Sequence, residues 1–184
     1  MPEADQAHGV PYAPGSTQVD EWSQAIYDRL VDWPPASGAK WERWEPGYLV
    51  LTITGESSDP FDPIVLYTCE DELAATFGYW ETELPSEVPA GIDDADAAVK
   101  EAKELVADWL AGRTLTAVYF DASDEWCGSL TVDPAEVFDR LRYGAGWIKD
   151  FHPARIELRA ARRKDWRHFV IRDGEIHAAQ AAPA

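Results

Sequence analysis

The sequence lacks basic residues over most of its length. Residues 1–112 contain only 5 Lys and Arg against 23 Asp and Glu, whereas residues 113–184 contain 11 of each, so the net charge of −18 arises in the first segment. A negative field of this size disfavours binding to nucleic acid or to an anionic membrane and speeds encounter with a basic partner. We therefore expect a basic protein partner, such as a toxin or nuclease-like enzyme, and neither nucleic acid nor membrane.

Cysteine is also scarce. Cys69 and Cys127 form no Cys-x-x-Cys pair and match no zinc spacing. Each lies in an apolar run that is typical of a strand, so we expect two buried, reduced thiols. A disulfide would require the two strands that carry them to be adjacent.

Long apolar runs are absent too. No run approaches the ~20 residues that a membrane-spanning helix needs. The N-terminal residues are acidic and lack the apolar region of a signal peptide. We expect a cytoplasmic protein.

What the chain has in quantity is apolar and aromatic residues. Hydrophobic residues make up 46% of it, with nine Trp, seven Tyr and six Phe, which is too apolar for a disordered chain despite the charge. We predict a mobile arm over residues 1–16, a single domain over 17–177 and a mobile tail over 178–184. Nine indoles are difficult to bury completely, so we expect two or three at the surface, where Trp is a favoured binding anchor.

Three segments carry helical signals. A helix over residues 19–32 would have Thr17 or Asp20 as its cap, and Trp22, Ile26, Leu30 and Trp33 form one apolar stripe. Residues 93–111 have a continuous apolar stripe, acidic residues at the start and Gly112 as the stop. Residues 133–136 are an Asp-Pro-Ala-Glu opening for a short helix with Val137, Phe138 and Leu141 inward, ended by Gly144 and Gly146.

The remaining apolar runs alternate with period two, as strands do. They cover residues 48–54, 64–69, 73–83, 115–120, 127–132, 154–161 and 166–171. Short turns between them favour hairpins. The fold class we predict is therefore α+β, a mainly antiparallel sheet of about 6–7 strands with three helices, two of them packed on one face.

The candidate partner-binding residues are carboxylates and aromatic residues of predicted loops and strand ends. In a single strand over residues 73–83, Phe77, Tyr79, Glu81 and Glu83 would share one face, with Trp80 on the other. Simple solubility is the competing interpretation of the acidic residues. The full candidate set is Trp41, Glu42, Trp44, Glu45, Tyr79, Glu81, Glu83, Asp93, Asp94, Asp124, Glu125 and Trp126.

Trp41 and Trp44 stand three residues apart in a predicted loop after Pro34-Pro35. They could clamp a ligand ring or anchor a partner, and packing against the first helix is the competing interpretation. A small-molecule-binding protein or an enzyme with a Trp-lined pocket near Trp41, Trp44 or Trp126 is therefore an alternative function. A DNA mimic, with carboxylates spaced like phosphates, is a further one.

We predict no catalytic residues, no metal site and no cofactor. Asp121, Asp124 and Glu125 lack the EF-hand pattern and are read as a solvated turn. No nucleophile elbow, zinc-protease motif or phosphate loop occurs. Residues 151–172 are locally basic, and we expect their arginines to pair with carboxylates elsewhere in the fold.

The stretch from Leu73 to Glu83, the Asp-rich entry to a helix that ends at Gly112, and a following hairpin with Trp126 and Gly128 are similar to small uncharacterised bacterial proteins. In general character the chain resembles immunity proteins of bacterial polymorphic toxin systems over about residues 45–132. The resemblance implies a tight-binding antitoxin that blocks the active site or substrate groove of a toxin. It assigns no individual residue.

Overall fold

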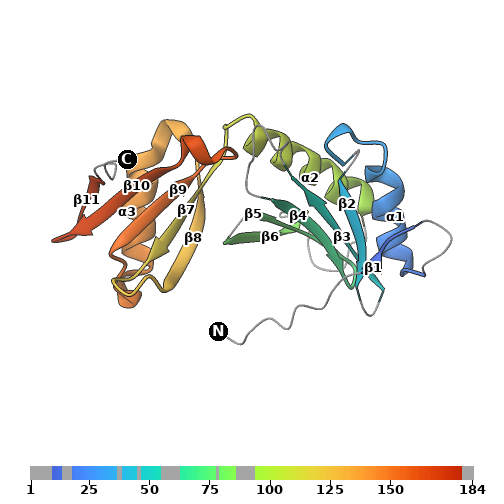
Figure 1. Cartoon of the computed structure of the whole chain (residues 1–184), viewed down its shortest axis with the longest axis horizontal. Coiled ribbons are helices and arrows are strands. Elements are labelled where there is room, and N and C mark those ends of the chain that lie inside the picture. The colour runs from blue at the N-terminus through green and yellow to red at the C-terminus, as the bar shows by residue number, and fades with distance from the viewer. Residues whose placement is uncertain are drawn as a thin grey trace. The chain divides into compact units, whose positions relative to one another are not determined.

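The computed structural model describes residues 10–13, 18–36, 39–44, 47–54, 63–77, 79–85 and 94–179. Within these ranges the chain forms eleven strands in two antiparallel sheets, with three α-helices (Figure 1). The α+β class and the sheet of six strands are thus as predicted, and a second sheet holds five more strands. Contacts divide the described residues into two compact units, one from 10–54, 63–76 and 81–104, the other from 77–80 and 105–179. The predicted domain limits, residues 17–177, stay a prediction.

The first sheet follows the chain, with each strand beside the next in sequence. Its order is β1-β2-β3-β4-β5-β6. The strands are β1 (Val10–Pro11), β2 (Lys40–Trp44), β3 (Tyr48–Ile53), β4 (Ile64–Cys69), β5 (Glu72–Phe77) and β6 (Trp80–Leu84).

Helix α1 (Glu21–Leu30) begins where Asp20 accepts a hydrogen bond from the Ser23 backbone N–H at 2.6 Å. Trp22, Ile26 and Leu30 of the predicted stripe are buried on this helix, whereas Trp33 lies beyond its end and is half-buried. The stripe lies against β3 and β4. Tertiary burial of this face, more than helix propensity, stabilises a helix of ten residues.

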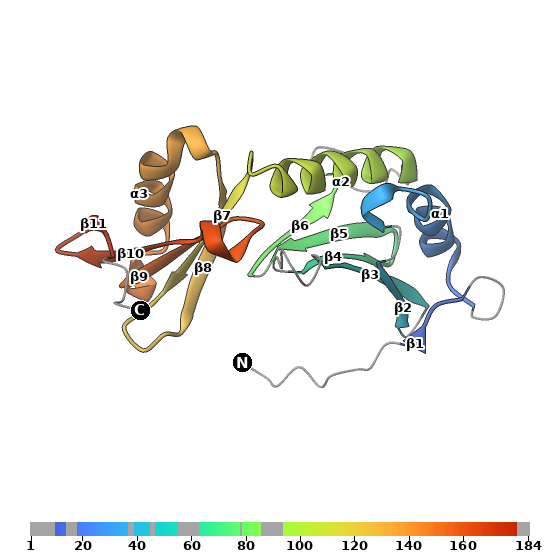
Figure 2. The ribbon, with the colours of Figure 1, turned by 45° about the horizontal axis from the view of Figure 1, so that its top comes forward.

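Helix α2 (Ala95–Leu110) is capped by Asp94, which accepts from the Ala97 N–H at 2.9 Å. Gly112 follows it with φ +70°, a left-handed conformation that suits glycine. Asp96 pairs with Arg29 of α1 at 2.5 Å, and Lys103 donates to the Arg29 carbonyl at 3.0 Å. These contacts place α1 and the first part of α2 side by side on one face of the first sheet, as predicted (Figure 2).

The second sheet has the order β11-β10-β9-β7-β8. Its core faces α3 (Val137–Trp147), where the Tyr119 hydroxyl donates to the Leu141 carbonyl at 3.0 Å and both side chains are fully buried. The predicted hairpin of residues 115–120 and 127–132 is confirmed. The strands are β7 (Leu115–Phe120), β8 (Trp126–Val132), β9 (Arg155–Arg159), β10 (Arg167–Arg172) and β11 (Glu175–Ala178).

The prediction that Gly144 and Gly146 end the third helix is wrong, because α3 continues to Trp147. Gly144 is required by packing, since a Cβ there would lie 2.2 Å from the Tyr119 hydroxyl and 2.4 Å from Leu130 Cδ2. Glycine in a helix interior is unfavourable but tolerated when two elements approach closely. Phe138 does not face inward as predicted, since it is exposed and its ring contacts Phe169 edge to face.

Another prediction is wrong. The predicted strand 73–83 is two strands, with the chain turning at Tyr79, so Phe77, Tyr79, Glu81 and Glu83 do not share one strand. Within the predicted arm, Val10–Pro11 forms β1, and Tyr12 is buried with its hydroxyl donating to Gln24 at 2.7 Å. Ala178, the first residue of the predicted tail, is the last residue of β11.

Both cysteines are free, but the prediction that both are buried is wrong, because Cys127 is half-buried and Cys69 is exposed. The reason lies in the alternation of β4, where Ile64, Leu66 and Thr68 are buried and Cys69 falls at the outward parity. The number of surface indoles is as predicted, because Trp44, Trp126 and Trp147 are exposed.

Candidate functional site

The strand register of the first unit separates two faces of its sheet. Leu51 of β3 pairs with Leu66 of β4, and these buried residues lie on the face that α1 covers. A hydrogen bond of 2.5 Å between the hydroxyls of Ser23 in α1 and Thr68 in β4 fixes the same face. Residues of the other parity, such as Tyr67, therefore project from the opposite face. We call this opposite face the outer face.

Strand β2 contributes Glu42 and Trp44 to the outer face. Glu42 pairs with Val50 and Trp44 with Tyr48, whereas Trp41 pairs with Leu51 on the helix side. There the Trp41 ring packs edge to face on Tyr27 of α1, with 4.8 Å between ring centroids. Trp41 and Trp44 thus point to opposite faces of a strand and do not form a clamp in a loop. The contact of Trp41 with Tyr27 confirms the competing interpretation, that one of the two indoles packs against the first helix.

Strand β6 contributes Glu81 and Glu83. Both are exposed, and both raise the pKa of Tyr67 above its usual value, after burial of the phenol as the largest cause and together with a hydrogen bond to Glu81. The two carboxylates therefore lie beside Tyr67 on the outer face. Within the described part of the chain neither carboxylate has an ion-pair partner.

The outer face combines an exposed indole with carboxylates that face solvent. Trp44 is 43% exposed. Glu42 is nearly buried and is paired with Lys40 at 2.9 Å, so its charge is partly compensated. The charges left for a partner are those of Glu81 and Glu83, at the β6 edge of the sheet. Trp44 on β2 and the two carboxylates on β6 lie on the same face, with strands β3, β4 and β5 between them.

The second unit contains four of the candidate residues, Tyr79, Asp124, Glu125 and Trp126. Trp126 is exposed and its ring stacks on Tyr79 with 6.2 Å between centroids. Asp124 is occupied by Arg155, with an N–O distance of 3.0 Å. Glu125 is exposed in a turn where its N–H donates to the Asp121 carboxylate at 2.9 Å. These carboxylates build the solvated turn that the sequence predicted.

Of the two candidate carboxylates at the entry to α2, the structure describes Asp94. Asp94 accepts the capping hydrogen bond of α2. Asp93 and Glu45 lie outside the described residues. Among the residues that are described, no group of three His, Cys, Asp or Glu could hold a metal ion.

Sequence reasoning missed an aromatic ridge on α3 and the 3-10 turn η3 (Lys149–Phe151). Tyr143, Trp147 and Phe151 are each more than 60% exposed. Their spacing of four residues was visible in the sequence as one helical face. It was overlooked because the glycines at 144 and 146 were read as the end of the helix.

The basic segment of residues 151–172 fits its prediction only in part, because Arg155 pairs with Asp124 outside the segment, whereas Glu157, the partner of both Arg155 and Arg159, lies within it. Arg155 and Arg159 both hydrogen bond to Glu157 between them, the Arg159 Nη2 atom at 2.7 Å from the Glu157 carboxylate. Burial alone would raise the pKa of Glu157, but the hydrogen bonds from Arg159 and Arg155 hold it below its usual range. Arg155 and Arg159 are therefore paired with carboxylates of their own unit and do not form a free basic strip.

No protein-family model matches the chain, and neither a curated protein nor a solved structure does. Among the described helices, none has the length and apolar character to cross a lipid bilayer. The function must therefore be argued from the site alone.

Proposed function

We propose that the protein is a binding module that receives a basic protein on the outer face of its first sheet. The observation that carries the proposal is the placement of Trp44, Glu81 and Glu83 on one face, although Trp44 and the two glutamates lie almost forty residues apart. Folding places them on one face, with strands β3, β4 and β5 between them. A surface that carries an exposed indole and carboxylates without an ion pair has the composition of a binding surface, with an aromatic anchor and a polar rim.

The carboxylates and the indole would act at different stages of binding. The negative field of residues 1–112 attracts a cationic protein and raises its association rate. Burial of Trp44 and of apolar atoms around it then slows dissociation, because aromatic anchors contribute much of the lasting affinity at protein interfaces. This division predicts association that is sensitive to salt and dissociation that is sensitive to Trp44.

The proposal includes inhibition as its consequence. A nuclease-like toxin or another enzyme with a basic substrate groove would lose access to its substrate when that groove docks on the outer face. This is the immunity-type function that the sequence resemblance implies, and the proposal keeps the predicted cytoplasmic location. The pairing of Arg155 and Arg159 with Glu157 supports the exclusion of nucleic acid as the partner, since these cations are already compensated.

Site-selective photo-cross-linking tests the proposal. A benzoylphenylalanine replaces Trp44 in one variant and the exposed Glu104 of α2 in a matched control, and both are irradiated in lysate of the native host. We expect a basic protein to be cross-linked from position 44 only, and less of it at high salt. Equal cross-linking from both positions, or capture of only acidic proteins from position 44, would refute the proposal.

A further inference from the structure

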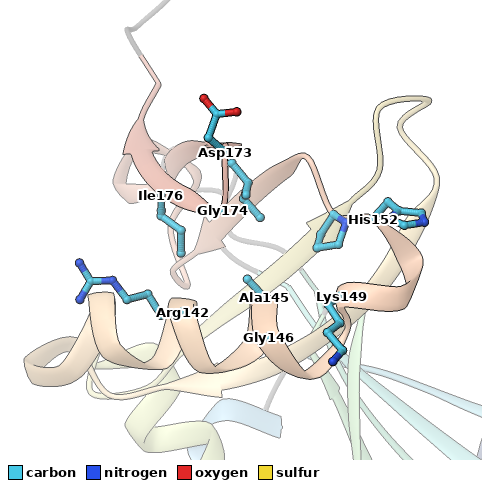
Figure 3. Close-up of a pocket in the computed structure, with 10 residues that line it drawn as sticks. Arg142, Ala145, Gly146, Lys149, His152, Asp173, Gly174 and Ile176 are labelled. Atoms are coloured by element: carbon cyan, nitrogen blue, oxygen red, sulfur yellow. The ribbon is translucent and has the colours of Figure 1, made fainter.

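A pocket of about 500 Å³ lies in the second unit between α3 and the β10–β11 hairpin (Figure 3). One wall is a single face of the helix, since Arg142, Ala145, Gly146 and Lys149 are spaced by three and four residues. The other wall is the hairpin. Its volume is in the range of small-molecule sites, about 300–1,000 Å³.

The hairpin wall is fixed by its turn. Asp173 and Gly174 have φ of +53° and +79°, the backbone of a tight two-residue hairpin turn. Ile171 and Ile176 pair across this hairpin and both line the pocket. Figure 3 shows the Ile176 side chain directed from the hairpin toward the helix, above Ala145. The pocket therefore has an apolar floor held by a rigid turn.

Gly146 gives the pocket a feature that helix packing does not explain. A Cβ at Gly144, one half-turn earlier, would collide with Tyr119, whereas a Cβ at Gly146 would meet nothing within 4 Å. Glycine in a helix costs about 1 kcal/mol relative to alanine. Close packing explains why residue 144 is a glycine but does not explain why residue 146 is one. Its position in the pocket lining explains the glycine, because a side chain at residue 146 would occupy the pocket.

The charged groups of the lining are mostly basic. The lining contains three basic side chains, Arg142, Lys149 and His152, and one carboxylate, Asp173. Arg142 is 70% exposed and its ion pair with Asp139 is long, 3.6 Å, so its guanidinium is not fully engaged. A guanidinium fork binds carboxylate or phosphate oxygens through two parallel hydrogen bonds.

We propose that this pocket binds a small organic anion, whose oxyanion head contacts Arg142 and whose apolar body lies on Ile171 and Ile176. The chemistry is shared by carboxylates and phosphate monoesters that carry a compact hydrocarbon group. The site shares no residue with the outer face, so either proposal can fail without the other.

Methyl NMR tests the proposal with defined probes. The full-length protein is labelled at isoleucine δ methyls, and Ile171 and Ile176 are assigned with single Ile→Val variants. Benzoate and phenyl phosphate are titrated, with benzyl alcohol as the neutral control and inorganic phosphate as the control without an apolar body. We expect saturable shifts at these two isoleucines for at least one of the two organic anions, and weaker effects for both controls. Binding of benzoate alone or phenyl phosphate alone identifies the head group.

Two variants link any binding to this pocket. Gly146→Leu fills the open space and is expected to abolish the shifts, whereas Arg142→Gln is expected to lower affinity about tenfold, the loss of roughly one charge-assisted contact. Arg113→Gln, which removes an exposed arginine paired with Asp108, is the matched control and should bind as the wild type does. Absence of saturable shifts with both organic anions, or undiminished binding by Gly146→Leu, would overturn the proposal.

Discussion

The two units treat their charged residues in opposite ways. In the second unit Glu157 lies between Arg155 and Arg159, and the three side chains are 14%, 30% and 13% exposed. In the first unit Glu81 and Glu83 stand exposed at a sheet edge. A charge that is paired inside its own fold contributes to structure, whereas an exposed and unpaired one contributes to the field that a partner meets.

This difference explains what the uneven sequence charge means in three dimensions. Residues 113–184 have equal numbers of acidic and basic residues, and the structure brings several of them together as local pairs. Residues 1–112 have too few cations for such pairing. Where the first unit needs a buried polar contact it uses neutral groups, the hydroxyls of Ser23 and Thr68. The carboxylates of Glu81 and Glu83 thus remain available at the surface.

The largest expected effect concerns the packing of the second unit. Gly144→Ala should destabilise the protein by about 3 kcal/mol, because the new methyl group displaces Tyr119 and its hydrogen bond to Leu141. Gly146→Ala, in the same helix, should instead stabilise it by up to about 1 kcal/mol. Urea denaturation measures both, and the same sign for the two variants would contradict this account of α3.

The next largest expected effect concerns Glu157, whose carboxylate is paired with Arg155 and Arg159. Glu157→Gln should lower the free energy of unfolding by about 2 kcal/mol at neutral pH, because two partly buried arginines lose their carboxylate. The matched control is Glu125→Gln, an exposed carboxylate of the same unit, which should change the free energy little. Equal changes in the free energy of unfolding for the two variants would mean that the charge of Glu157 does not stabilise the fold.

The pH dependence of this effect has a definite sign. The pKa of Glu157 is lower in the folded protein than its ordinary value of 4.5. Its contribution to stability is therefore fully present above that ordinary value and is lost as the pH falls through the folded pKa. The difference between wild type and Glu157→Gln should shrink over this acidic window, as measured by urea denaturation at successive pH values. A difference that grows on acidification would contradict the direction of the shift.

A smaller effect is expected at the neutral contact of the first unit. Thr68→Val should destabilise by about 1 to 2 kcal/mol, because the Thr68 hydroxyl accepts from the Leu49 N–H at 2.8 Å and also contacts Ser23. Thr82→Val, at a half-buried hydroxyl of β6 whose hydrogen bond is long at 3.3 Å, is the control. Hydrogen exchange at Leu49 provides the local readout, and unchanged exchange there would argue against the contact.

The smallest effect on stability is expected on the outer face. Glu81→Gln with Glu83→Gln should change the free energy of unfolding by less than about 0.5 kcal/mol, because neither carboxylate has an ion pair within the described residues. Urea denaturation beside Glu157→Gln makes the comparison direct. A loss as large as that of Glu157→Gln would show that these charges are structural and not available for binding.

Local signals in the sequence were sufficient for the helices of the first unit. The apolar stripe of α1, the cap at Asp20 and the glycine stop after α2 are each set by residues within one or two turns, so they could be read directly. The hairpin of β7 and β8 was equally clear from its alternation. Such features need no knowledge of the rest of the fold.

The elements that were missed depend on distant partners or on an overlooked turn. β2 was read as a loop because it follows two prolines, and it becomes a strand by pairing with β3. β1 has two residues and exists only through β2. β11 had a local signal, since Asp173-Gly174 is a favoured hairpin turn that was not used. The outer face could not be predicted because it depends on register across several strands.

The affinity of charge-reversed variants for the cross-linked basic partner tests the central claim most directly. Glu81→Lys with Glu83→Lys is compared with Asp32→Lys and Glu104→Lys, two exposed carboxylates whose reversal changes the net charge by the same amount. The account predicts a loss of about 100-fold for the first pair and only a few-fold for the second, since opposed charges matter most where the surfaces meet. Equal losses for the two pairs would show that only the overall charge matters and would contradict the outer face as the binding site.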